Sequence, residues 1–163
     1  MKEKDVNIRI AKIRELSRQN SINRWELMRY CGSKITVTLE SRFHARPARH
    51  CVSLVVATRY HCMRDQLRHD LLYYGIEVFF DIEPFSSLDA NDNGEMELPP
   101  RLMTIMYGVA IGALRGMLAQ KVERTQLRDY PLPLINISEL VSCHIYGTPA
   151  PEHAIPLIDF RYN

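Results

Sequence analysis

The sequence predicts an α+β protein: a four-stranded antiparallel sheet, then a long helix and a short second helix. Before residue 98, apolar and polar residues alternate with the period of two that is typical of strands. After residue 98, apolar residues recur with the period of about 3.6 that is typical of a helix. A polar, turn-rich linker, residues 86–97, separates the two patterns, and strands followed by helices are the α+β layout.

The opening segment, residues 6–20, fits two structures. Val6, Ile8 and Ile10 alternate as in a strand, whereas Val6, Ile10 and Ile13 lie at helical spacing. We favour the strand and leave the helix as the alternative.

Three further runs predict consecutive strands. In residues 35–43 most odd-numbered positions are apolar and the even-numbered positions are polar. This alternation gives a strand one face for the core and one for water. Residues 52–60 and 72–82 repeat the pattern. The segments between them, RPAR at 46–49 and CMRDQLR at 62–68, are short, so the three strands are predicted to form an antiparallel meander.

Residues 98–127 are predicted to form one long helix whose three glycines share a face. Gly108, Gly112 and Gly116 are four residues apart and therefore line up along the helix. A glycine inside a helix costs about 1 kcal/mol relative to alanine, so three indicate close packing of another backbone. We expect an oligomer interface here, in a dimer or tetramer. The uncharged run 102–114 is shorter than the roughly 20 apolar residues of a membrane span, so we expect none.

Prolines shape the chain after this helix. Pro131 and Pro133 exclude a helix until Asn136, and Asn136 or Ser138 suits the start of a short helix. The proline-rich tail, residues 147–163, is expected to be extended, and either to fray or to dock on a sheet edge. We interpret residues 1–163 as a single domain.

Composition narrows the class of protein. An apolar content of 46% with 25% charged residues is typical of a soluble globular chain, and we expect it in the cytoplasm. The net charge of +2 is too small for a dedicated nucleic-acid binder.

The order of the predicted elements resembles the SecB export-chaperone family. The most specific similarity is YPLPLINISEL, residues 130–140, which is similar to the proline-rich passage between the two C-terminal helices of that family. The resemblance covers most of residues 8–146. It implies four antiparallel strands and two helices, assembled as a dimer or a dimer of dimers, that act as a holdase for unfolded polypeptides without enzymatic activity or a cofactor.

By position, the resemblance also implies a client-binding groove. Trp25 precedes the strand at residue 35, where the family often carries an aromatic residue beside its groove. Six residues are expected to line the groove: Trp25, Tyr30, Tyr74, Phe85, Leu132 and Leu140. The alternative is that these residues belong to the core, because large apolar residues are more often buried than functional.

The chain departs from the family in its charge. SecB is typically acidic and engages the SecA motor through acidic surface, whereas this chain is slightly basic. This difference argues against coupling to SecA. The sequence leaves the client open, and export substrates and an antitoxin both remain candidates.

Metal and catalytic motifs are incomplete. Asp89, Asn91, Asn93 and Gly94 match the start of a calcium-binding EF-hand loop, but position twelve, where a glutamate is required, is Pro100. The pairs His50-Cys51 and His61-Cys62 contain zinc-binding residue types, but neighbours on a strand point to opposite faces. We therefore predict no metal site, no cofactor and no catalytic residue.

A nucleic-acid-binding module is the alternative function. Arginine and histidine residues crowd the hairpin at residues 42–50, and three further arginines lie within residues 59–68. Guanidinium groups at sheet loops can hold phosphates. A solvated, charged sheet edge accounts for the same residues and is the interpretation that we prefer.

Overall fold

The computed structural model describes residues 6–30, 34–90, 96–146 and 155–162. The main sheet is built from six strands: β1 (Asn7–Glu15), β2 (Ser21–Ile22), β3 (Ile35–Arg46), β4 (Cys51–Arg64), β5 (Leu67–Glu83) and β8 (Ile155–Tyr162). The α-helices are α1 (Arg24–Met28), α2 (Pro100–Val122) and α3 (Ile137–Tyr146). Short elements connect them: η1 (Pro47–Arg49), η2 (Phe85–Ser87), η3 (Gln126–Asp129) and the strand pair β6 (Asp89–Ala90) and β7 (Met96–Glu97).

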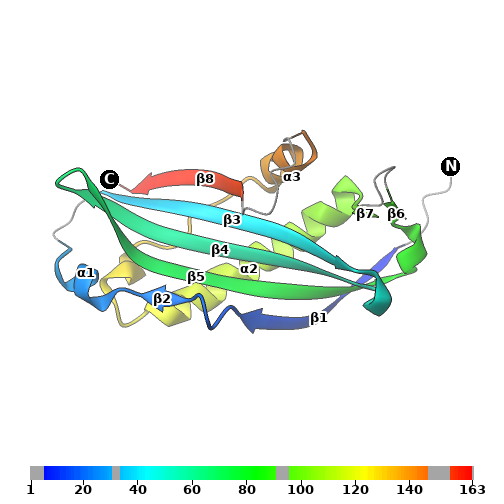
Figure 1. Cartoon of the computed structure of the whole chain (residues 1–163), viewed down its shortest axis with the longest axis horizontal. Coiled ribbons are helices and arrows are strands. Elements are labelled where there is room, and N and C mark those ends of the chain that lie inside the picture. Colours follow the sequence, from blue (N-terminus) through cyan, green and yellow to red (C-terminus); the bar gives the residue numbers. More distant parts are fainter. Residues whose placement is uncertain (1–5, 31–33, 91–95, 147–154, 163) are drawn as a thin grey trace.

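The fold is α+β, as the sequence predicts. Strand order in the antiparallel sheet is β1-β5-β4-β3-β8, and β2 adds to β5. Helix α2 crosses one face of this sheet and α3 packs against α2 (Figure 1).

The predicted meander is confirmed, with longer strands than expected. The segment 62–68 is mostly strand, because the connection between β4 and β5 is the two-residue turn Asp65-Gln66. Both residues have positive φ, 52° and 64°, as a type I′ hairpin turn requires. Glycine or asparagine usually marks this turn, so its position was difficult to recognise from the sequence.

The sheet has two strands more than the four predicted, because β2 adds to β5 and β8 adds to β3. Residues 7–15 form β1, which resolves the opening segment in favour of a strand. In the tail, β8 pairs with β3 between residues 35 and 41, so the tail docks on a sheet edge; residues 147–154 lie outside the described part of the chain.

Alternation along the strands places the core between the sheet and α2. Register pairs on this face include Leu54 with Val78 and Val56 with Ile76, and all four side chains are fully buried. From α2, nine side chains are buried: Leu102, Met103, Met106, Tyr107, Ala110, Ile111, Leu114, Leu118 and Val122.

Helix α2 is shorter than the predicted 98–127. It starts at Pro100, where the missing N–H is harmless, and ends at Val122, after which the Thr125 hydroxyl accepts a hydrogen bond from Leu127 N in η3. Its length and apolar composition would also suit a membrane span. Of its most apolar 18-residue stretch, 44% is buried inside the protein.

The proline-rich passage is tied to α2. The Arg115 guanidinium donates to the carbonyl of Pro133 at 3.0 Å and to that of Leu132 at 3.4 Å. Asn136 then begins α3, because its side-chain oxygen accepts hydrogen bonds from Ser138 N and Glu139 N, as predicted.

Gly75 is a position of close packing on the sheet face opposite α2. A Cβ there would lie 2.8 Å from Ala57 Cβ and 2.8 Å from Leu16 Cδ1. The Asn20 side chain bonds both to the N–H and to the carbonyl of Gly75, at 2.8 and 3.1 Å, and so fastens the turn after β1 to β5.

Gly75→Ala should lower the free energy of unfolding by about 1–3 kcal/mol, because Ala57 Cβ belongs to a paired strand and cannot move away. Adding Ala57→Gly should recover part of that loss, since it removes one of the two colliding atoms. Urea denaturation of both single variants and the double variant measures this coupling. Equal stability of Gly75→Ala and wild type, or strict additivity, would contradict the close approach.

Candidate functional site

Three of the six predicted groove residues lie in the core. Tyr74, Leu132 and Leu140 are at most 4% exposed. The Tyr74 hydroxyl donates to Glu15 at 2.9 Å, and burial together with this carboxylate raises the pKa of Tyr74. These side chains stabilise the packing of the sheet against the helices and present no surface to a client in this conformation.

Of the other three, Trp25 and Tyr30 lie on or next to α1, and Phe85 lies beyond the far end of β5. Tyr30 packs edge-on against Tyr130, with 3.3 Å between their hydroxyls. Phe85 stacks on His50 beyond the end of β5, and Trp25 lies on α1 near the start of β5. Because β5 has 17 residues, its ends are about 55 Å apart, and Figure 1 places α1 and the end of β5 at opposite ends of the molecule. The six residues therefore form no single groove within the chain.

Large apolar side chains are instead exposed at the α1 end of the molecule. Trp25 is 62% exposed and Met28, three residues later on α1, is 70% exposed. Met63 and Leu67, next to the β4–β5 turn, are 55% and 64% exposed. They lie on opposite faces of the hairpin tip, because their register partners are the neighbouring residues Arg68 and Arg64. We call these four residues the end surface. Of these four, the sequence indicates only Trp25, because Met63 and Leu67 lie in the segment 62–68, for which it predicts a connection between strands.

An ionic cluster fastens α1 to the β4–β5 hairpin beside the end surface. Glu26 lies 3.0 Å from an Arg64 nitrogen and 3.2 Å from His69 Nδ1. Desolvation raises the pKa of Glu26, but the Arg64 hydrogen bond and the nearby cationic groups outweigh it and lower that pKa overall. Leu27 of α1 is buried, so the exposed Trp25 and Met28 are held on a fixed element.

The glycine face of α2 is open. An added Cβ at Gly108, Gly112 or Gly116 would meet no atom within 4 Å among the described residues. Exposed apolar side chains lie on the same side of the sheet: Ile105 of α2, and Ile10 and Ile13 of β1, whose register partners Phe80 and Val78 are core residues. This side of the molecule therefore combines exposed apolar side chains with an uncovered stretch of helix backbone.

Most arginines of the two basic hairpins are neutralised by carboxylates. The pairs are Arg46 with Glu77, Arg59 with Glu40 and Asp70, Arg64 with Glu26, and Arg68 with Asp70. Within the described chain, Arg42 and Arg49 have no such pair. This pairing leaves little unbalanced charge for a run of phosphates.

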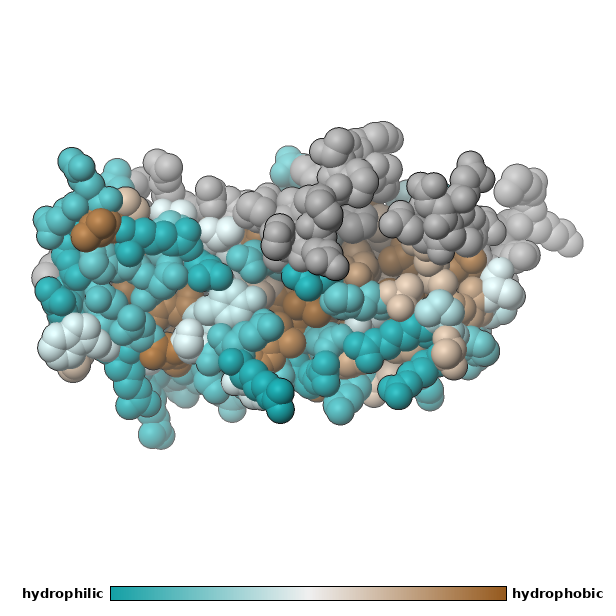
Figure 2. Space-filling model, viewed as in Figure 1, coloured by the Kyte–Doolittle hydropathy of each residue, from teal (hydrophilic) through white to brown (hydrophobic). Residues whose placement is uncertain are grey.

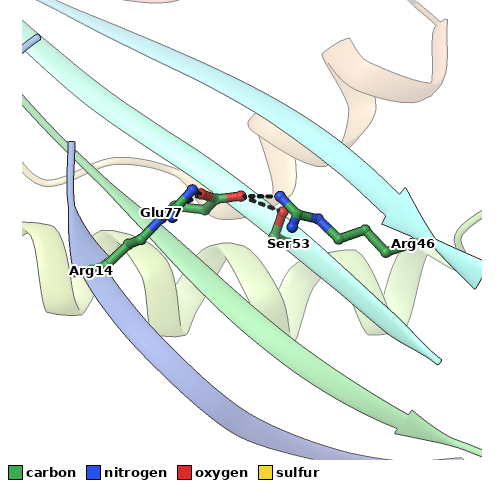
Figure 3. Close-up of polar contacts among 4 residues, drawn as sticks. All are labelled: Arg14, Arg46, Ser53 and Glu77. Atoms are coloured by element: carbon green, nitrogen blue, oxygen red, sulfur yellow. Dashed lines mark hydrogen bonds and ion pairs between the residues drawn. The ribbon is translucent and has the colours of Figure 1, made fainter. Parts of the chain in front are cut away.

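The face of the sheet opposite α2 is mostly hydrophilic (Figure 2). Its centre is Glu77 of β5, which is 3% exposed. Glu77 accepts hydrogen bonds from Arg14 of β1, from Ser53 of β4 at 2.7 Å and from Arg46 of β3 at 3.2 Å (Figure 3). Desolvation raises the pKa of Glu77, but these hydrogen bonds and the two guanidinium charges outweigh it and lower that pKa overall.

The candidate metal ligands are separated by the fold. Cys51 and Cys62 are buried free thiols at opposite ends of β4, about 36 Å apart along an extended strand. The two His-Cys pairs therefore cannot share one ion. Asn91, Asn93 and Gly94 of the EF-hand-like segment lie outside the described residues.

Comparison with known proteins gives no family for this chain. No protein-family model and no curated protein matches it. Among solved structures, it is similar to the crystal structure of a protein of unknown function from Streptococcus agalactiae, with 12% identity and a TM-score of 0.31 over 81% of this chain and 97% of that chain. This similarity carries no inference about function.

Glu77→Gln should lower the free energy of unfolding by about 2–4 kcal/mol at pH 7, because two guanidinium groups lose their buried partner. The pKa of Glu77 is lower in the folded chain than the value of about 4.3 expected on unfolding. Its contribution is therefore complete above that pH and is lost as the pH falls through the folded pKa. Urea denaturation between pH 7 and about pH 3 should show the difference from wild type shrinking. The exposed Glu83→Gln serves as control, and a pH-independent difference would contradict the assignment.

Proposed function

We propose that this protein is a SecB-like holdase that binds nonnative polypeptides at the end surface. The observation that carries the proposal is the concentration of four large, exposed apolar side chains, on α1 and at the β4–β5 turn. Methionine and tryptophan adapt to many partner sequences, because thioether chains are flexible and aromatic rings offer a large contact area. Such a surface binds extended apolar segments without requiring one sequence.

The charge around the end surface suits the same role. Arg29 lies over the Trp25 ring at 5.8 Å, and Arg64 and Glu26 form an ion pair between α1 and the hairpin. Polar groups at the rim of an apolar surface keep the unoccupied protein soluble and leave contact with clients dominated by side-chain burial. No chemical step is part of this proposal.

We further propose that subunits associate through the glycine face of α2. Three open glycines let a second helix backbone approach closely, and Ile10, Ile13 and Ile105 supply apolar area to bury beside it. Two end surfaces would then belong to one assembly, which raises the effective concentration of binding sites for a long client.

The holdase proposal predicts that the protein suppresses aggregation of a chemically unfolded model protein at near-stoichiometric ratio. The double variant Trp25→Ser, Met63→Ser should lose most of this suppression, because half of the end surface becomes polar. Leu134→Ser is the matched control, since Leu134 is 93% exposed but lies on the proline-rich passage. Aggregation of the model protein is measured by light scattering.

Equal suppression by the two variants would reject the end surface as the client site. No suppression by wild type, together with RNA or DNA binding that weakens steeply with salt, would favour the nucleic-acid alternative.

Gly112→Leu should convert the assembly to smaller species in sedimentation velocity. Its side chain would project from the open face and prevent close helix approach, while the subunit itself has space for it. Ser142→Leu, at an exposed site on α3, is the control for an added apolar side chain elsewhere. An unchanged sedimentation coefficient for Gly112→Leu would exclude this interface.

A further inference from the structure

The hydrophilic face of the sheet contains a hollow of about 450 Å³. Strands β1, β3 and β5 supply its polar lining, β4 supplies its floor at Val55 and Ala57, and Leu16 and Gln19 close one side. The charged and polar side chains that line it are Arg14, Glu40, Arg42, His44, Arg46, Tyr73 and Glu77. Its volume lies within the range of about 300–1,000 Å³ that small-molecule sites occupy.

The hollow has an excess of positive charge. Three guanidinium groups line it, against two carboxylates. One of those carboxylates, Glu40, also lies 3.8 Å from Arg59, whose cation offsets it from outside the hollow. The guanidinium group of Arg42, an exposed residue, has no ion pair and no hydrogen bond among the described residues.

Two of the guanidinium groups are held in position before any ligand binds. Arg14 and Arg46 approach from opposite sides and contact the same carboxylate, Glu77, as Figure 3 shows. Both also lie over the Phe79 ring, at 5.2 and 5.1 Å from its centre. An ordered guanidinium loses little side-chain entropy when it binds a further group.

These guanidinium groups retain unused donors. Each guanidinium has five N–H bonds, and Glu77 engages Arg14 through Nε and one terminal nitrogen, and Arg46 through one terminal nitrogen. The remaining N–H groups and the unpaired Arg42 suit a planar or tetrahedral oxyanion, which accepts two parallel hydrogen bonds from one guanidinium.

We propose that this hollow binds a small organic anion through a carboxylate or phosphate group, held by Arg14, Arg42 and Arg46. The inference does not rest on the holdase proposal, because the end surface and the hollow share no residue. A nucleic acid fits less well, since Arg59, which adjoins the hollow, is already paired with Glu40 and Asp70.

The test follows the arginine Nε–Hε signals of the full-length, ¹⁵N-labelled protein by NMR. Inorganic phosphate and succinate are titrated separately up to about 10 mM, against sodium chloride at matched ionic strength. Saturable shifts confined to Arg14, Arg42 and Arg46 are expected with at least one probe. A response to phosphate alone or to succinate alone identifies the anionic group, and a response to both supports the shared chemistry.

Arg42→Gln should weaken binding about tenfold, because one charge-assisted hydrogen bond is lost. Arg49→Gln removes the same charge from the neighbouring turn, outside the hollow, and should change affinity by less than about twofold. The wild-type titration tests the proposal even where a variant fails to fold. No saturable shift with either probe, or equal weakening by the two variants, would overturn it.

Discussion

One long helix covers one face of a sheet whose central strands are up to 17 residues long, and the rest of the structure depends on this packing. Met106, Tyr107 and Leu114 of α2 are fully buried, and burial of each such side chain contributes about 1.5–3 kcal/mol. The Tyr107 hydroxyl also bonds to Ser41 of β3 at 2.8 Å, so this buried polar atom has a partner.

Because α2 covers one face, the other face has to satisfy its polar groups by itself. Burying a carboxylate there would be costly without compensation, and Glu77 receives two guanidinium groups and one hydroxyl. These contacts also connect β1, β3, β4 and β5, so the cluster links the edge strand to the centre of the sheet. The two faces consequently differ in chemistry: one presents apolar residues and glycine, and the other presents fixed cationic groups.

Regular, local patterns were predictable from this sequence. Alternation in residues 35–43, 52–60 and 72–82 was sufficient for the meander, and Asn136 marked the start of the last helix. The site was harder to predict, because a large apolar residue has the same letter whether it is buried or exposed. Tyr74 and Leu140 became core, whereas Met28 and Leu67 became surface, and only packing against neighbours distinguishes the two cases.

The sequence by itself determined the α+β class, the order of the meander strands and the two later helices, and the face that the glycines of α2 share, because each follows from a period of two or about 3.6 along the chain. Tertiary structure alone decided that this glycine face is open, that the tail extends the sheet at β3, and that Arg14, Arg46 and Glu77 meet. Those contacts join residues far apart in the chain. No local pattern encodes such a contact, since it depends on how strands pair and on which surface the helix leaves uncovered.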